Sequence, residues 1–243
     1  MENIFYISFN TRAGWLYPAL NRLNQTSSAV LRKRYSEHWH GKESELGKLA
    51  LVVEAKLSKL PIVVAAVDKD IRLLEDELKA RKSEVDECIA RQSSLSLRRE
   101  ELGLSLSANI ESFLYHARST YESIRRFLIK FSRTILEKSL TEADIRDILE
   151  RESIATEWID VLNDDRNLVA HESTLWCDLR MVVDDPRKYE VLIGEIHSVE
   201  PAQYRALASY GSIRANFMYS LAKLGEWMLR QIEDEETISG AQF

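Results

Sequence analysis

The stretch LGLSLSANIESFLYHARSTYESIRRFLIKFSRTI, residues 102–135, decides the fold class. Its apolar residues recur at steps of three and four, the spacing of one face of an α-helix. This predicts a long helix, from about Arg98 to Lys138, that buries one side in a helical bundle. The predicted buried positions are Leu102, Leu106, Ile110, Phe113, Ala117, Tyr121, Ile124, Leu128, Phe131 and Ile135.

The polar side of the same helix is basic. Its cations are Arg118, Arg125, Arg126, Lys130 and Arg133. Such a face either contacts RNA phosphates or is an ordinary solvated helix surface, and the sequence leaves both interpretations open. His116 lies next to the apolar stripe, where we expect a packed or locally hydrogen-bonded ring.

The composition of the 243 residues is typical of a folded protein, with 45% hydrophobic and 30% charged residues. Only 8 glycines and 4 prolines interrupt the chain, so we expect long helices in one large or two small domains. The net charge of −6 argues against nucleic-acid binding by bulk electrostatics. Any contact with RNA would therefore be local.

No segment has the length or the pattern of a membrane span or a secretion signal. The longest apolar runs, Leu49–Val53 and Leu60–Val67, are too short to cross a bilayer. Cys88 and Cys177 belong to no motif, which favours two reduced thiols over a disulfide or a metal site. We therefore predict a cytoplasmic protein without a membrane partner.

The residues before the long helix predict a helical extension. An apolar segment, residues 1–12, comes first and is a candidate strand; a helix from Trp15 to His38 follows, then a stretch from Ser44 to Gln92 that Pro61 would kink. A heptad-like seam runs through Val64, Val67, Ile71, Leu74, Leu78, Arg81, Val85 and Cys88. The seam fits a helical hairpin within the chain as well as a coiled coil between chains.

The residues after the long helix predict short helices and then a β-hairpin at about 177–198, with a turn at Asp184-Asp185-Pro186-Arg187. A last long helix is expected from Pro201 to about Glu233. His38 and His40 could be imagined as metal ligands, but two surface histidines beside Gly41 are the preferred interpretation. There is no Gly-rich phosphate loop and no Gly-x-Ser-x-Gly elbow, so we predict no cofactor and no metal.

The segment Arg166-Asn167-Leu168-Val169-Ala170-His171 combines groups that can handle a phosphodiester. A guanidinium binds phosphate oxygens, and an imidazole exchanges a proton near neutral pH. On a helix, five residues place Arg166 and His171 about 140° apart around the axis. One copy therefore supplies half a site, and two copies facing each other across a twofold axis would complete it.

This segment resembles the signature of HEPN domains, in which an arginine and a neighbouring polar residue precede a histidine by a few positions. The resemblance covers roughly residues 98–235 and implies a mainly α fold: a HEPN-like antiparallel bundle over 96–235 with the small hairpin inserted. Residues 1–95 would be the helical or coiled-coil extension, and 236–243 a flexible tail. The acidic residues Asp164, Asp165 and Glu172 depart from a phosphate-binding environment.

The resemblance implies a metal-independent endoribonuclease of the toxin–antitoxin or anti-phage type. Arg166, Asn167 and His171 would be its catalytic residues, and its partners would be substrate RNA, a second copy of the chain, and an antitoxin or defence protein. Some HEPN domains have lost catalysis, so the alternative is an inactive helical scaffold or interaction subunit of a multi-protein complex. In such a scaffold, Arg166 would form a salt bridge and His171 would form a structural hydrogen bond.

Overall fold

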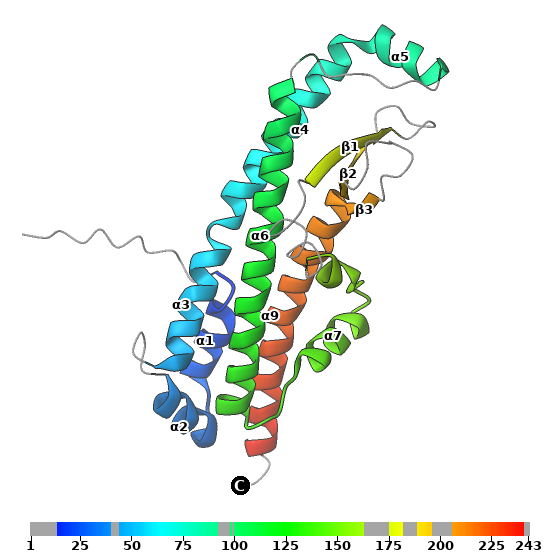
Figure 1. Cartoon of the computed structure of the whole chain (residues 1–243). Helices are drawn as coiled ribbons and strands as arrows, with labels where there is room; N and C mark the ends of the chain where they lie inside the picture. The colour runs from blue at the N-terminus through cyan, green and yellow to red at the C-terminus, as the bar shows by residue number, and fades with distance from the viewer. Residues whose placement is uncertain are drawn as a thin grey trace, which may run out of the picture. The chain divides into compact units, whose positions relative to one another are not determined.

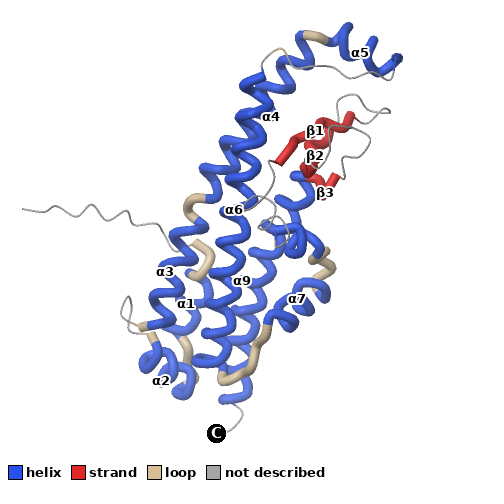
Figure 2. The backbone as a smooth tube through the Cα atoms, in the orientation of Figure 1, coloured by secondary structure: helices blue, strands red, loops and turns tan. Residues whose placement is uncertain are grey.

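The structure, a computed structural model, is mainly helical (Figures 1 and 2). It describes residues 14–39, 44–91, 98, 100–162, 175–181, 189–195 and 206–240. The chain divides into two units, each treated separately below. Unit 1 consists of residues 1–58, 122–148 and 221–243, and unit 2 of residues 59–121 and 149–220. Each unit therefore contains residues from both sides of the expected boundary near residue 95.

Among the described residues, strands occur only between residues 175 and 209, and the other regular elements are helices. The helices are α1 (Tyr17–Gln25), α2 (Ala29–His38), α3 (Glu45–Leu57), α4 (Leu60–Ala80), α5 (Lys82–Arg91), α6 (Glu100–Phe131), α7 (Glu142–Arg151) and α9 (Tyr210–Gly240). A π-helical turn, Ser132–Leu136, follows α6, and residues 157–162 are also helical. The strands are β1 (Leu175–Met181), β2 (Tyr189–Glu195) and β3 (Ala206–Ser209).

The predicted single helix over residues 15–38 is in fact two helices, α1 and α2. The chain leaves the helical conformation at Thr26, and Ser28 begins the next helix as its N-cap. The Ser28 hydroxyl accepts a hydrogen bond from the Leu31 amide at 3.3 Å. A serine with this geometry satisfies an amide that the first helical turn leaves unpaired, so it starts a new helix.

The predicted kinked helix over residues 44–92 is three separate helices. Pro61 lies in the first turn of α4, where a missing amide hydrogen costs no helical hydrogen bond. The proline therefore marks a helix start rather than a kink. A second break falls at Arg81, which ends α4 and precedes α5.

In unit 2, α4 and α6 form an antiparallel hairpin. The Asp70 carboxylate on α4 accepts hydrogen bonds from Ser105 Oγ at 2.8 Å and Asn109 Nδ2 at 2.7 Å. Seven residues further along α4, the Glu77 carboxylate accepts a hydrogen bond from the backbone amide of Arg98 at 2.7 Å, just before α6 begins. Later residues of α4 therefore lie beside earlier residues of α6, so the two helices are antiparallel. The apolar seam of α4 thus packs within the chain.

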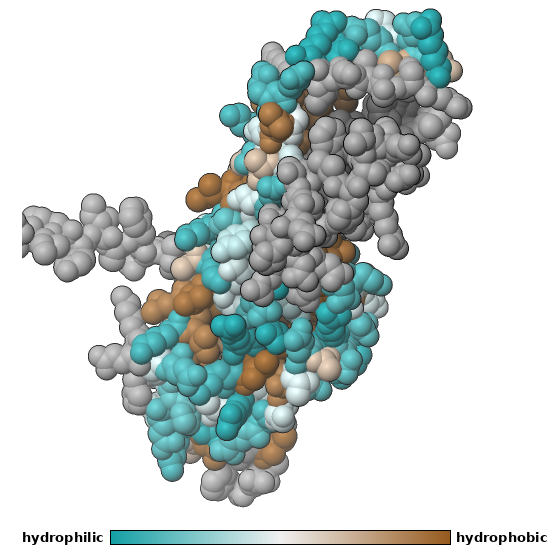
Figure 3. Space-filling model, in the orientation of Figure 1, coloured by the Kyte–Doolittle hydropathy of each residue, from teal (hydrophilic) through white to brown (hydrophobic). Residues whose placement is uncertain are grey.

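The junction of α4 and α5 is held by charge. Arg81 is 8% exposed and its guanidinium donates to Glu77 at 3.2 Å and to Glu84 at 2.8 Å. Glu84 also binds Arg98 at 2.6 Å. The visible surface of α5 is mostly hydrophilic (Figure 3), which agrees with a helix end stabilised by ion pairs rather than by an apolar core.

The buried stripe of α6 is confirmed. All ten positions predicted from the sequence are 5% exposed or less. The α-helix ends at Phe131, and the π-helical turn then carries Ile135 into the core as well. The backbone of Glu137 is left-handed, with φ of 52°, and this reverses the chain after the helix.

In unit 1, the start of the described chain is fixed against α9. The indole nitrogen of Trp15 donates to the carbonyl of Leu221 at 2.6 Å. Gly225 allows this approach, since a Cβ added there would lie 3.0 Å from the Trp15 indole nitrogen. The carboxylate of Glu54 on α3 accepts from the Leu16 amide at 3.1 Å, and burial raises the pKa of that carboxyl.

The three strands of unit 2 form one antiparallel sheet in the order β1-β2-β3. Leu175 pairs with Glu195 at one end of the β1–β2 ladder and Met181 with Tyr189 at the other. The prediction of helix from Pro201 is wrong for residues 206–209, which form β3. Ser209 then caps α9 by accepting from the Ser212 amide at 3.3 Å, and α9 continues past the predicted end to Gly240.

Candidate functional site around the Arg166–His171 segment

The three candidate catalytic residues, Arg166, Asn167 and His171, lie outside the described residues, together with their acidic neighbours Asp164, Asp165 and Glu172. The structure does describe the chain up to Leu162 and again from Leu175. The described helices before and after this segment in the chain form a framework. That framework belongs to unit 2.

An aromatic cluster holds the helical residues 157–162 that lead into the segment. The Trp158 ring packs edge-on against Tyr121 of α6 at 5.2 Å and against Phe217 of α9 at 5.6 Å, measured between ring centroids. Phe113 packs edge-on against Tyr210 and Phe217 at 5.2 and 6.4 Å. All five rings are 3% exposed or less, so the cluster is fully buried.

The backbone of the same turn is also tied to α6. The guanidinium of Arg118 donates to the carbonyl of Leu162, the last described residue before the segment, at 3.2 Å. This contact joins the backbone of Leu162 to a side chain of α6. At the other end of this turn, Thr156 donates from its hydroxyl to Glu150 at 3.0 Å.

The N-terminus of α9 is fixed by a second polar contact. Arg214 on α9 pairs with Asp68 on α4 at 2.6 Å. The neighbouring Tyr210 is 3% exposed, and burial raises its pKa to about 12. Leu162 and the start of α9 are therefore both held by contacts to helices of the same unit.

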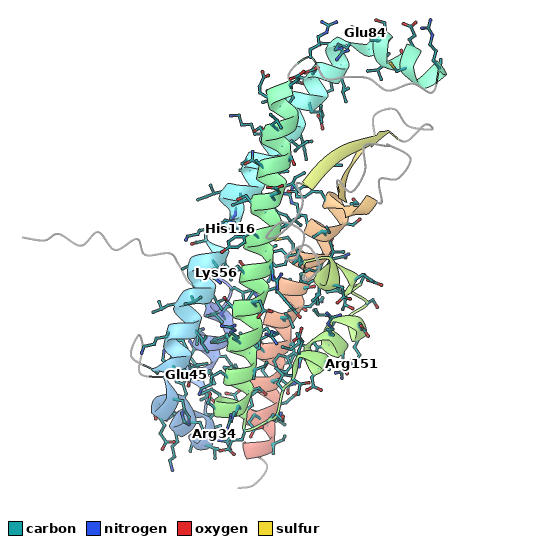
Figure 4. The ribbon with its side chains drawn as sticks, in the orientation of Figure 1. Arg34, Glu45, Lys56, Glu84, His116 and Arg151 are labelled. Carbon is teal, nitrogen blue, oxygen red and sulfur yellow. The ribbon has the colours of Figure 1, made fainter. Side chains whose placement is uncertain are left out.

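His116 is a described histidine of the long α6 helix (Figure 4). Its Nδ1 lies 2.8 Å from the carbonyl oxygen of Ser112, which can only accept, so Nδ1 donates this hydrogen bond. The ring also packs edge-on against Tyr115. The predicted local hydrogen bond is confirmed, and it assigns His116 a structural role one helical turn from its partner.

Two of the five cations on the basic face of α6 are closely paired with nearby acids. Arg125 pairs with Glu122 at 2.8 Å and with Glu142 at 2.7 Å. Lys130 binds Glu45, and this contact lowers the pKa of the Glu45 carboxyl. Arg126 reaches Glu122 only at 4.0 Å. The face therefore has the character of a solvated helix surface rather than of a continuous path for phosphates.

No protein-family model, curated protein or solved structure matches this chain.

The chemistry of the described residues is that of a helical framework. Within the described ranges, no group of three or more His, Cys, Asp or Glu side chains is placed to hold a metal ion. His38 ends α2, whereas His40 lies outside the described residues. Cys88 is half-buried. None of the described helices is both long enough and apolar enough to span a membrane.

Sequence reasoning missed the residues that hold the framework around the segment. Arg118 was assigned to a basic surface, yet its guanidinium donates a hydrogen bond to the carbonyl of Leu162. Asp68 and Arg214 are 146 positions apart, and no sequence pattern links them. Trp158 lies between α6 and α9. Its position between two long helices depends on their packing, which a single-sequence periodicity does not specify.

Proposed function

We propose that this chain is a metal-independent endoribonuclease of HEPN type that acts as a toxin or anti-phage effector. The observation that carries the proposal is the sequence Arg166-Asn167-Leu168-Val169-Ala170-His171, between the helical residues 157–162 and β1. Its support is the pairing of a permanent cation with a titratable ring, which suits phosphodiester chemistry near neutral pH.

In the proposed reaction, the 2′-hydroxyl of RNA attacks the adjacent phosphorus and the bond to the 5′-oxygen breaks. Arg166 holds the phosphate and stabilises its added negative charge. His171 takes the proton of the 2′-hydroxyl or supplies a proton to the leaving oxygen, and Asn167 positions the substrate. The products are a 2′,3′-cyclic phosphate and a free 5′-hydroxyl, and no metal takes part.

The framework supports this proposal by fixing where the segment begins. Trp158 and the Arg118–Leu162 contact anchor the preceding turn to α6, so a segment that follows it starts from a defined position. A rigid framework around a short reactive segment is the usual arrangement for catalytic residues on connecting chain. The basic face of α6 is partly neutralised, which favours recognition of RNA at one local site over binding along the whole helix.

The test uses purified full-length protein and an end-labelled RNA in the presence of EDTA. Wild type is expected to cleave the RNA and leave a 2′,3′-cyclic phosphate, whereas Arg166→Ala and His171→Ala lose cleavage by at least about 100-fold. Arg126→Ala, which removes an exposed cation of α6, serves as the matched control and should cleave like wild type. Equal cleavage by wild type and both motif variants would overturn the proposal.

A second candidate function, a non-enzymatic helical interaction subunit, is favoured by large apolar side chains on the outside of unit 2. Leu104 and Tyr115 of α6 are 72% and 70% exposed, and Ile62 of α4 is 71% exposed. Leu104 and Tyr115 are eleven positions apart, which is close to three helical turns, so they point in nearly the same direction. This function predicts intact RNA with wild type, and loss of assembly with a partner protein in Leu104→Ser/Tyr115→Ser.

A further inference from the structure

A hollow opens in unit 1 where α6 ends. Its volume is about 470 Å³, within the range of small-molecule sites. It is lined by Ile129, Arg133, Glu137, Lys138, Ser139 and Leu140. All six come from one continuous piece of chain, the last turns of the long helix and the connection to α7.

The backbone of this hollow is preorganised. The π-helical turn ends at Glu137, whose left-handed backbone (φ of 52°) reverses the chain. The Lys138 amide then donates to the Ser132 carbonyl at 3.0 Å, and the Ser132 hydroxyl donates to the Lys138 carbonyl at 3.1 Å. These reciprocal bonds fix the connection against the helix. Single π-helical turns occur frequently at functional sites, because they displace side chains from the regular helical positions.

The charges around the hollow leave positive groups available. Arg133 is exposed and forms no ion pair within 4.0 Å with any carboxylate of the described residues, unlike Arg125 and Lys130 on the same face. Glu45, whose carboxyl pKa is lowered by Lys130 and slightly by the charge of Arg133, is already bound by Lys130. The guanidinium of Arg133 is therefore free to take up an external anion.

The remaining polar groups favour the same ligand. Lys138 contacts Gln231 at 3.2 Å and Glu235 at 3.8 Å, and its ammonium has three N–H donors, so these two contacts leave one for a ligand. The one acid of the lining, Glu137, is neutralised by Arg34 at 2.6 Å. The Ser139 hydroxyl adds a neutral donor, and Ile129 and Leu140 supply half-buried apolar walls.

We propose that this hollow binds a small phosphorylated molecule. Arg133, Lys138 and Ser139 receive its phosphate, and its apolar portion lies against Ile129 and Leu140. Two cations and a hydroxyl match a doubly charged tetrahedral group with several acceptor oxygens better than they match a planar carboxylate. This inference goes beyond the proposed ribonuclease activity, because none of its residues belongs to the Arg166–His171 segment.

The test is calorimetric titration of the full-length protein with phenyl phosphate, which combines a phosphate and an apolar ring. Phenol and inorganic phosphate are titrated as the two halves of the probe. Wild type should bind phenyl phosphate more tightly than either half. Arg133→Ala and Lys138→Ala should each weaken binding about tenfold or more, as expected for the loss of a charge-assisted hydrogen bond. Circular dichroism melting establishes that each variant is folded.

Arg126→Ala is the matched control, since it removes another exposed cation of the same helix and lies outside the hollow. It should bind phenyl phosphate like wild type, as should Arg166→Ala. The proposal is overturned if phenyl phosphate does not bind, if Arg133→Ala binds it unchanged, or if inorganic phosphate binds equally tightly. A ten-nucleotide RNA that binds, and loses affinity equally in Arg126→Ala and Arg133→Ala, would instead indicate an extended RNA surface and also overturn it.

Discussion

At the scale of single residues, Trp158 links the framework of unit 2 to the segment that carries the proposed chemistry. Its ring is 3% exposed and contacts rings on both α6 and α9. Burial of an aromatic side chain of this size contributes strongly to stability, and edge-on ring contacts add to it. The effect of removing Trp158 should therefore appear in folding as well as in activity.

Trp158→Ala should lower the free energy of unfolding by about 3–5 kcal/mol, because it leaves a cavity between two helices. It should also reduce RNA cleavage, since the turn before Arg166 loses its anchor. Tyr115→Ala, which truncates a 70% exposed ring of α6, is the control and should change stability by about 0.5 kcal/mol or less. Urea unfolding measures both, and equal losses in the two variants would contradict the prediction.

Tyr210 should make the protein sensitive to alkaline pH. Burial raises its folded-state pKa from 10.0 to about 12. The folded state therefore holds this proton more tightly than the unfolded state does. The resulting stability is fully present below pH 10 and is lost as the pH rises from about 10 to 12.

Tyr210→Phe keeps the ring and removes the ionising hydroxyl. Its unfolding free energy should therefore fall less steeply than that of wild type between pH 10 and 12. Urea unfolding at a series of pH values gives the two slopes, and phenolate absorbance reports the titration of the tyrosines directly. Parallel curves for the two proteins would show that Tyr210 is not the group responsible.

At the scale of elements, the hairpin of α4 and α6 shows where sequence periodicity succeeds and where it fails. The predicted α6 stripe is apolar, and its period identifies ten buried positions, although Leu114, Thr120, Ser123 and Phe127 are buried as well. On α4 the true buried side includes Asp70, which is 5% exposed, whereas Ile71 and Leu78 of the predicted seam are only half-buried. A hydrophobic period cannot include a carboxylate whose burial depends on donors 35 and 39 residues away.

Asp70→Ala should cost about 1.5–3 kcal/mol of unfolding free energy, since Ser105 and Asn109 would lose a charged acceptor inside the hairpin. Ser105→Ala/Asn109→Ala should be comparably destabilising, because it leaves the Asp70 carboxylate buried without its donors. The triple variant removes the whole network and should recover part of the loss. Thermal or urea unfolding checks this, and a triple variant less stable than both others would contradict it.

At the scale of the whole molecule, the two units interleave along the chain, so the expected division at residue 95 does not describe how residues group in space. The single-chain geometry of the Arg166–His171 segment also predicts an assembly. If one copy supplies the arginine and its partner the histidine, the active species contains two chains.

This predicts complementation between two inactive variants. Arg166→Ala and His171→Ala, each inactive alone, should regain cleavage when they are unfolded together and refolded as a mixture. Mixed dimers then hold one intact Arg166 facing one intact His171, and random pairing makes about half of all dimers mixed. The same mixture without refolding is the control. No recovery after refolding would indicate that both residues of a site come from one chain.

The sequence by itself predicted the mainly helical fold, ten buried positions of α6 and a helix over most of residues 210–233, and the candidate site at Arg166, Asn167 and His171 stays a prediction. These follow from local spacing, since a helix places residues three and four apart on one side whatever surrounds it. Only the tertiary structure decided that α4 pairs with α6, that Arg118 donates a hydrogen bond to the Leu162 carbonyl, and that residues 206–209 form a strand. Each of these depends on a partner far along the chain, and the free energy that selects it appears only when the two segments pack together.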